Sequence, residues 1–222
     1  MNHKMLVVAP HPDDEVLGCG GLLLRRRFER VPLAWLVVTG MNVSDGFSVE
    51  QVEKRANEIK ELATCIGFEE VYELNYPAAR LDEIPMRDLV GSISKVFQAF
   101  CPSEILLPHR GDVHSDHRVV FDAVTACTKW FRYPSIQRVL AYETVSETEF
   151  GLSREQAFFP NYFVDISPYL DEKLRLMKVY QSEIGVPPFP RSIQVIKALA
   201  TWRGSSAGYD AAEAFELLRE NH

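Results

Sequence analysis

The chain has 222 residues, of which 46% are hydrophobic and 25% are charged, and its formal net charge is −7. This is the composition of an ordinary globular protein with one sizeable core. The negative charge argues against a nucleic-acid partner or an anionic membrane surface, because both favour basic patches. No apolar run approaches the ~20 residues of a transmembrane segment, and the first four residues lead into a strand rather than a secretory leader.

Four cysteines, Cys19, Cys65, Cys101 and Cys127, show no Cys-x-x-Cys spacing. Free and mostly buried thiols fit a reducing compartment, so we expect a cytoplasmic protein. The chain contains no linker, internal repeat or low-complexity segment, so residues 1–222 are expected to form a single domain. The last third reads as mostly helical, and its helices could pack between the subunits of a homo-oligomer.

Apolar runs and helical stripes alternate along the first two thirds of the chain. The predicted strands are 5–8, 33–39, 71–74, 104–107 and 139–142, with a sixth candidate at 162–165. The predicted helices are 21–30, 49–66, 86–100, 117–130, 170–181, 193–202 and 211–219. This alternation predicts an α/β protein with a Rossmann-like, mostly parallel sheet and helices on both faces.

A burst of polar residues follows the first predicted strand. His11, Asp13, Asp14 and Glu15 lie within five positions, where open α/β sheets place their ligand sites. His11 and Asp14 are three residues apart at a strand-to-helix turn, so both could point inward while Asp13 stays free. Taken alone, this segment could also be a turn followed by a helix N-cap.

The fourth predicted strand ends in a second polar segment, at residues 108–117. There His114 and His117 are three apart near a helix start, a spacing that shares one face, although Asp116 alone could be a capping residue. Two such clusters at strand ends are hard to explain by chance, and in a parallel sheet these ends can lie side by side. We therefore expect a metal site with three His or carboxylate ligands and an additional acid or base.

The roles of the other polar residues nearby are less well defined by the sequence. Glu15 is expected to support the ligands or the first helical turn rather than to bind metal. Asp112 could orient its loop or touch substrate, whereas His109 and Arg110 read as parts of a surface loop.

The two clusters resemble the signature motifs of the PIG-L / LmbE-like family of zinc-dependent deacetylases. Residues 9–15, APHPDDE, resemble the HPDDE signature, and residues 114–117, HSDH, match the HxDH motif. Residues 55–58, RANE, resemble an RxxE helix of the family, and residues 213–215 resemble a common carboxyl-terminal pattern. The resemblance spans nearly the whole chain.

This resemblance implies that His11, Asp14 and His117 bind one zinc ion and that Asp13 is the general base. Two imidazoles and one carboxylate would leave the site with a net positive charge, which lowers the pKa of bound water toward ~7. Asp13 could then take the proton of this water as it attacks an amide carbonyl.

The resemblance further implies that His114 stabilises the oxyanion, with Asp116 holding its imidazole. A neighbouring carboxylate would raise the pKa of His114 and keep it cationic. The leaving nitrogen must be protonated, and either Asp13 or His114 could deliver that proton. Arg55 and Arg80 are expected to face the substrate.

The leading functional expectation is hydrolytic removal of an acetyl group from an N-acetylglucosamine-like sugar or conjugate. Two alternatives stay open. The same zinc chemistry could act on a non-sugar amide, such as a thiol conjugate, a lipid or an antibiotic precursor, or the protein could be a non-catalytic sugar-binding descendant of the fold. In the non-sugar alternative the loops 40–48, 75–85 and 185–190 would set the pocket, and their aromatic and proline content would suit either a sugar face or an apolar acyl chain.

Overall fold

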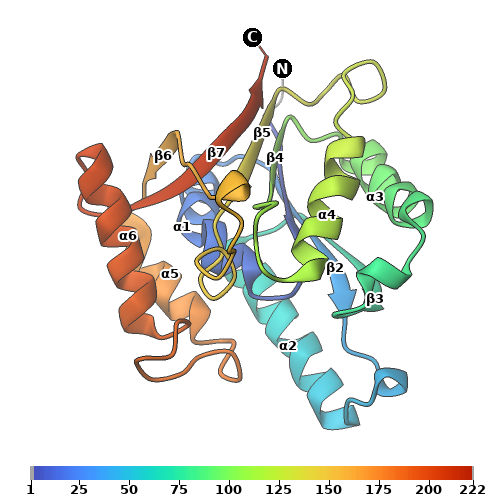
Figure 1. The fold of residues 1–222 in the computed structure, drawn as a ribbon, viewed down its shortest axis with the longest axis horizontal. Helices are drawn as coiled ribbons and strands as arrows, with labels where there is room; N and C mark the ends of the chain where they lie inside the picture. The colour runs from blue at the N-terminus through green and yellow to red at the C-terminus, as the bar shows by residue number, and fades with distance from the viewer. Residues whose placement is uncertain (1–2, 222) are drawn as a thin grey trace.

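The computed structural model describes residues 3–221, whose seven strands form one sheet in the order β3-β2-β1-β4-β5-β7-β6 (Figure 1). The strands are β1 Met5–Ala9, β2 Leu33–Gly40, β3 Glu70–Pro77, β4 Glu104–Pro108, β5 Arg138–Tyr142, β6 Tyr162–Asp165 and β7 Ala212–Glu220. Strands β1 to β5 run parallel, and β7 lies antiparallel to both β5 and β6. The predicted Rossmann-like, mostly parallel sheet is confirmed.

Helices cover both faces of this sheet, as expected. They are α1 Asp14–Phe28, α2 Val49–Ile66, α3 Met86–Phe100, α4 Ser115–Ala126, α5 Leu170–Met177 and α6 Ile193–Ala207. The central strand β1 sends Met5, Val7 and Ala9 into one core, against α1, α2, α5 and α6. Its alternate residues Leu6 and Val8 enter a second core, under α3 and α4. Both faces are buried because a parallel sheet needs crossover helices on each side.

The chain order places the carboxyl ends of β1 and β4 side by side. From β1 the chain builds β2 and β3 on one side of the sheet, then crosses back so that β4 pairs with β1 on the other side. This change of direction is the topological switch point, where open α/β sheets bind their ligands. Both polar clusters follow these two strands.

The prediction of a helix over residues 211–219 is wrong, because this segment forms strand β7. Alanine, glutamate and leucine favour helices, but the segment fills the gap between β5 and β6, where Phe215 pairs with Tyr142 and with Tyr162. Its first four residues are all buried. The available edge of the sheet therefore overrides the intrinsic helix propensity.

Helix α1 begins at Asp14, seven residues before the expected start, and contains a break at Cys19 (φ −144°). Its glycines allow neighbours to approach closely: a Cβ at Gly21 would lie 2.6 Å from the side chain of Ile166. The break is bridged from outside the helix. Lys173 Nζ donates to the carbonyl of Leu17 at 2.8 Å and pairs with Glu213 at 2.7 Å.

The carboxylate of Glu213 completes this bridge. Its two oxygens accept from the backbone N–H groups of Gly21 and Leu22, each at 2.7 Å. Lys173 thus satisfies the carbonyl end of the first half of α1, and Glu213 satisfies the amide end of the second half. Both side chains are buried, so the broken helix depends on a desolvated ion pair.

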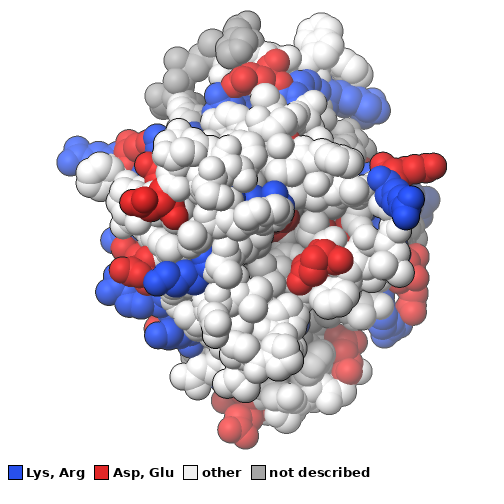
Figure 2. Space-filling view, turned by 60° about the vertical axis from the view of Figure 1, so that its left-hand side comes forward, with Lys and Arg blue, Asp and Glu red and all other residues white. Residues whose placement is uncertain are grey.

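On the face shown in Figure 2, basic and acidic side chains are interspersed and much of the surface is uncharged. This face carries no extended basic patch. The four cysteines are free, as expected, and Cys19 and Cys127 are buried. Among the described residues, none of the helices combines the length and the apolar character that crossing a bilayer requires.

Candidate metal centre and active-site cavity

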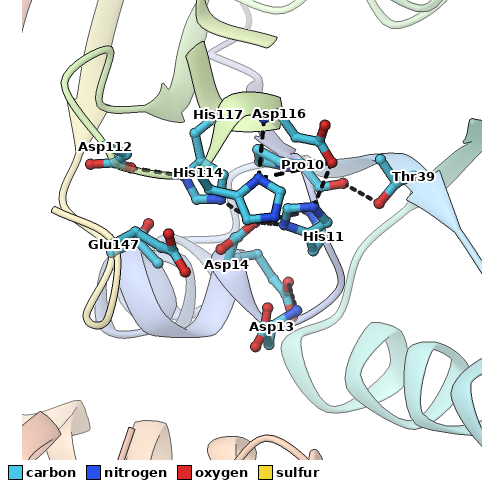
Figure 3. Close-up of polar contacts among 12 residues, drawn as sticks. Pro10, His11, Asp13, Asp14, Thr39, Asp112, His114, Asp116, His117 and Glu147 are labelled. Carbon is cyan, nitrogen blue, oxygen red and sulfur yellow. Dashed lines mark hydrogen bonds and ion pairs between the residues drawn. The ribbon is translucent and has the colours of Figure 1, made fainter. Parts of the chain in front are cut away.

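His11, Asp14 and His117 meet at the switch point, with potential ligand atoms of all three within 4.8 Å of one another (Figure 3). Asp14 Oδ2 lies 3.4 Å from His11 Nδ1 and 3.3 Å from His117 Nε2. The turn after β1 supplies His11 and Asp14, and the first turn of α4 supplies His117. Residues about a hundred positions apart therefore form one group.

The far nitrogen of each imidazole contacts a second carboxylate. His11 Nε2 lies 2.9 Å from Asp116 Oδ2, and His117 Nδ1 lies 2.8 Å from Asp112 Oδ2. We assign the ring protons to these outer nitrogens, because carboxylates only accept. The inner nitrogens then direct lone pairs at Asp14, an arrangement that is favourable only with a cation or a proton between them. Two nitrogens and one oxygen, with outer carboxylates on both rings, suit a divalent metal such as zinc.

The acidic surroundings strongly perturb the pKa values of this group. Burial disfavours charge on both rings, but Asp116 and Asp14 outweigh it and raise the pKa of His11 to about 9. Burial is likewise outweighed at His117, where Asp14 and Asp112 raise the pKa to about 10. Against its own burial, the two imidazoles hold the pKa of Asp14 well below its usual range. Protons therefore compete with a metal for these nitrogens.

Asp13 lies beside the metal group, held in an unusual backbone conformation with φ 128°. Its N–H donates to Glu15 Oε2 at 3.0 Å, and its Oδ2 accepts from Arg191 Nη1 at 3.0 Å. Burial and the charge of Asp14 raise the pKa of Asp13 to about 7. Positive φ is costly for a residue other than glycine, and such strain concentrates at functional sites. A carboxyl group with this pKa can take up and return a proton near neutrality.

Glu15 supports the turn that carries Asp13 and Asp14, as expected for an acid of the first helical turn. It is fully buried, and its Oε1 accepts from the hydroxyl of Tyr180 at 2.7 Å. Arg55 braces the turn from the side: Nη1 donates to the carbonyl of Pro12 at 2.8 Å, and Nη2 donates to Glu183 at 2.6 Å.

The expected pairing of His114 with the carboxylate of Asp116 differs in the structure. That carboxylate lies 4.0 Å from His114 Nδ1 and instead contacts His11 and the backbone N–H groups of Ala79, at 2.7 Å, and Leu81, at 3.2 Å. His114 Nδ1 accepts from the backbone N–H of Asp116 at 3.1 Å. Nε2 must therefore carry the proton of the neutral ring and can donate it in a hydrogen bond.

The expectation of a raised pKa for His114 is also wrong. Burial lowers the pKa to about 4, and the nearby His11 and His117 add to this effect more than Asp116 opposes it. His114, His11 and Asp116 form a second group within metal-binding distance. In that group the Nδ1 atom of His114 and the Asp116 carboxylate are already engaged by N–H donors, so the first group is the better metal site.

A cavity of about 470 Å³ opens beside the metal group. Its walls come from the segment after β2, one face of helix α2, the end of β3, the segment after β5 and the α5–α6 connection. The lining includes Met41, Asn42, Phe47, Val52, Ala56, Ile59, Glu73, Asn75, Thr144, Ser146, Glu147, Glu183 and Arg191. Two of the three predicted loops therefore contribute, whereas the third is represented by residues that flank 185–190.

Arg55 lines the cavity, but Arg80 does not join it. Arg80 points to solvent in a short turn and pairs with Glu83 at 2.6 Å. Sequence reasoning missed Arg191 and Glu147, which lie in irregular segments without a recognisable motif. Burial, assisted by Asp14, raises the pKa of Glu147 despite the opposing effect of His117.

His109, which read as a surface residue, is buried at the end of β4. Nδ1 lies 3.0 Å from Glu216 Oε2, and Nε2 lies 2.8 Å from the carbonyl oxygen of Gln156. Both partners are acceptors, so the ring must be doubly protonated to satisfy them. Although burial opposes the charge, Glu216 and Gln156 raise the pKa of His109.

A pH-dependent loss of stability follows from His109. Its folded-state pKa lies above the unfolded value of ~6.5, so its contribution is complete below that pH and disappears as the pH rises through the folded-state pKa. We expect His109→Gln to cost about 1–2 kcal/mol at pH 6 and less at pH 9. Urea unfolding of both proteins at the two pH values measures this. An equal difference at both would contradict the assignment.

Comparison with known proteins gives a consistent result. A family profile described as PIG-L: GlcNAc-PI de-N-acetylase matches residues 6–128. Diacetylchitobiose deacetylase from Thermococcus kodakarensis is 24% identical over 229 residues, covering 97% of this chain and 83% of the relative. Probable N-acetyl-alpha-D-glucosaminyl L-malate deacetylase 2 from Bacillus cereus is 25% identical over 195 residues, covering 82% and 84%.

Solved structures show the same fold. N,N'-diacetylchitobiose deacetylase from Pyrococcus horikoshii superposes with a TM-score of 0.78 at 22% identity, covering 97% of this chain and 84% of that one. The profile match covers both polar clusters, and the structural likeness also takes in the carboxyl-terminal part of the chain, where β7 and α6 lie.

Proposed function

Because the chain belongs to the PIG-L family, we propose that it is a zinc-dependent N-deacetylase acting on an N-acetylglucosamine-like sugar or sugar conjugate. The observation that carries the proposal is the group of His11, Asp14 and His117 with the unligated, buried Asp13 beside it. The two curated relatives are named for acetamido sugars, which supports the choice of substrate class.

Three side chains would hold the metal, through His11 Nδ1, Asp14 Oδ2 and His117 Nε2. A bound zinc ion would supply Lewis-acid activation of water and of the acetyl carbonyl. Asp116 and Asp112 accept from the outer ring nitrogens, which fixes both tautomers and both ring orientations.

Asp13 and His114 would carry the proton and charge transfers. Asp13 takes a proton from the water that attacks the acetyl carbon, and its pKa of about 7 suits this task. The neutral ring of His114 donates a hydrogen bond from its Nε2–H to the oxygen that gains negative charge. When the carbon–nitrogen bond breaks, Asp13 returns its proton to the nitrogen, so the products are acetate and the free amino sugar.

The cavity is large enough for a small molecule of the size of a sugar conjugate. Its apolar wall, which includes Met41, Phe47 and Val52, suits the carbon face of a sugar ring. A non-sugar amide would use the same centre. A binding protein without activity is less well supported, because the strained conformation of Asp13 serves no purpose in a site that only binds.

Acetate release from N,N'-diacetylchitobiose tests the proposal. Protein treated with a chelator and then loaded with zinc is expected to release acetate. Chelator-treated protein without added zinc and the His117→Ala variant are expected to release none above background. Acetate release that persists after chelation and in the His117→Ala variant would contradict a metal-dependent reaction. Sugar binding without acetate release would favour the binding-protein alternative.

Metal binding itself should release protons. His11 and His117, with pKa values of about 9 and about 10, are protonated at pH 7 and must each lose a proton to bind metal. We therefore expect zinc affinity to rise up to ~100-fold per pH unit near neutrality, with about two protons released per ion. Calorimetric titration in buffers of different ionisation enthalpy counts these protons. A binding enthalpy independent of buffer would contradict the raised pKa values.

A further inference from the structure

Acidic side chains outnumber basic ones in the lining of the cavity. The lining contains five carboxylates and two guanidinium groups, namely Asp13, Asp14, Glu73, Glu147, Glu183, Arg55 and Arg191. A divalent metal at the candidate centre would offset two of the carboxylates. One carboxylate charge then remains in excess, so the cavity as a whole favours hydrogen-bond donors over anions.

Both arginines of the lining lie against carboxylates. Arg55 is buried, and it donates to the carbonyl of Pro12 at 2.8 Å and to Glu183 at 2.6 Å. Arg191 Nη1 lies 3.0 Å from Asp13 and 3.4 Å from Glu183, whereas its Nε atom is buried and has no hydrogen-bond partner. Both positive charges thus lie directly against carboxylates of the cavity itself.

Glu147, in contrast, offers an acceptor that is largely unused. Its carboxylate receives one hydrogen bond, a long one of 3.4 Å from the hydroxyl of Ser146. Figure 3 shows Glu147 on the same side of the site as His117 and Asp14. A sugar hydroxyl placed beside the metal group could donate to this carboxylate, whereas a substrate carboxylate or phosphate would be repelled. At the outer rim, Glu73 is exposed and adds charge of the same sign.

We infer that the cavity selects acetamido sugars whose aglycone is uncharged over conjugates that carry a carboxylate or phosphate. This inference rests on the proposed function and specifies its substrate. The apolar residues of the wall, such as Phe47 and Val52, contact the carbon face of the sugar or a neutral aglycone, and Glu147 accepts from sugar hydroxyls.

A matched pair of substrates tests the inference. One is the N-acetylglucosaminide of glycolamide and the other that of glycolate, which differ only in a carboxamide against a carboxylate. At low ionic strength we expect kcat/KM for acetate release to favour the amide by about tenfold or more, which corresponds to ~1.4 kcal/mol. Added salt is expected to narrow the ratio, because it screens charges in an open cavity.

Three variants locate the source of the selectivity. Glu147→Gln is expected to narrow the ratio several-fold, and Glu73→Gln at the exposed rim is expected to narrow it less. Glu61→Gln changes the net charge equally at an exposed position of α2 outside the cavity lining, so it should leave the ratio unchanged. We expect the change in the kcat/KM ratio to arise mainly from KM rather than from kcat.

An equal or faster reaction of the glycolate would overturn the inference and would identify Arg191 as the receptor of the anion. If zinc-loaded, folded protein releases acetate from neither glycoside, the proposed function fails on its own. In that event the relative affinities of the two glycosides, measured by calorimetry, still decide the question of charge, with tighter binding of the amide expected.

Discussion

Asp13→Asn is expected to lower kcat/KM for acetate release by about 10²- to 10⁴-fold while the protein still binds zinc. The substitution removes the group that accepts the proton of water but keeps the size and shape of the side chain. Asparagine also tolerates positive φ better than most residues, so the backbone conformation at φ 128° should persist. Arg191 would keep Glu183 as a partner. Steady-state kinetics together with metal analysis of the purified variant measure the effect.

Asp13→Ala is the informative companion. It should lose the same activity and also unfold at lower denaturant concentration, because alanine has no means of relieving the strain of positive φ. Activity of Asp13→Asn within a few-fold of the parent protein would exclude Asp13 as the base. His114 would then be the next candidate for proton transfer.

Glu213→Gln is expected to destabilise the fold by about 3–5 kcal/mol, since it leaves the charge of Lys173 buried without a counter-charge. It also weakens the acceptor for the N–H groups of Gly21 and Leu22, which now share one carboxylate. The free energy of unfolding in urea measures the loss. Because this carboxylate holds the break in α1, whose first turn carries Asp14, we also expect weaker zinc binding.

The double variant Lys173→Met, Glu213→Gln separates charge from packing. Removing both charges should restore part of the lost stability, since no unpaired ion remains in the core. Arg80→Gln breaks an exposed pair and should leave the unfolding midpoint nearly unchanged. A single Glu213→Gln variant no less stable than the double variant would show that the buried pair contributes little.

The polar clusters made the centre of the molecule predictable. The two motifs could be placed together, because each follows a strand and parallel strands end at one edge; the choice of His11, Asp14 and His117 among the candidate ligands came from the family resemblance. The alternation of elements fixed the layers in the same way. Residue spacing carried this information, so the chain from β1 to β5 was read nearly correctly.

Features that depend on tertiary contacts could not be read in this way. The carboxyl-terminal segment is helix-prone in composition, and only the open edge beside β5 makes it strand β7. Asp116 was expected to charge His114, but the fold brings other donors closer to this carboxylate, namely His11 Nε2 and the backbone N–H of Ala79. Arg191 reaches Asp13 from a connection without any motif, so nothing in the spacing indicates it.

The switch point between β1 and β4 also has a consequence for engineering. The candidate catalytic groups lie on two turns anchored in the middle of the sheet, whereas the rest of the cavity lining comes mainly from helix α2 and from the connections that follow β2, β3, β5 and α5. Under the proposed function, the groups that carry out hydrolysis and those that contact the rest of the substrate therefore lie in separate stretches of the chain. Grafting the β2–α2 connection of another deacetylase onto this scaffold should redirect it to new amides with the hydrolytic step preserved.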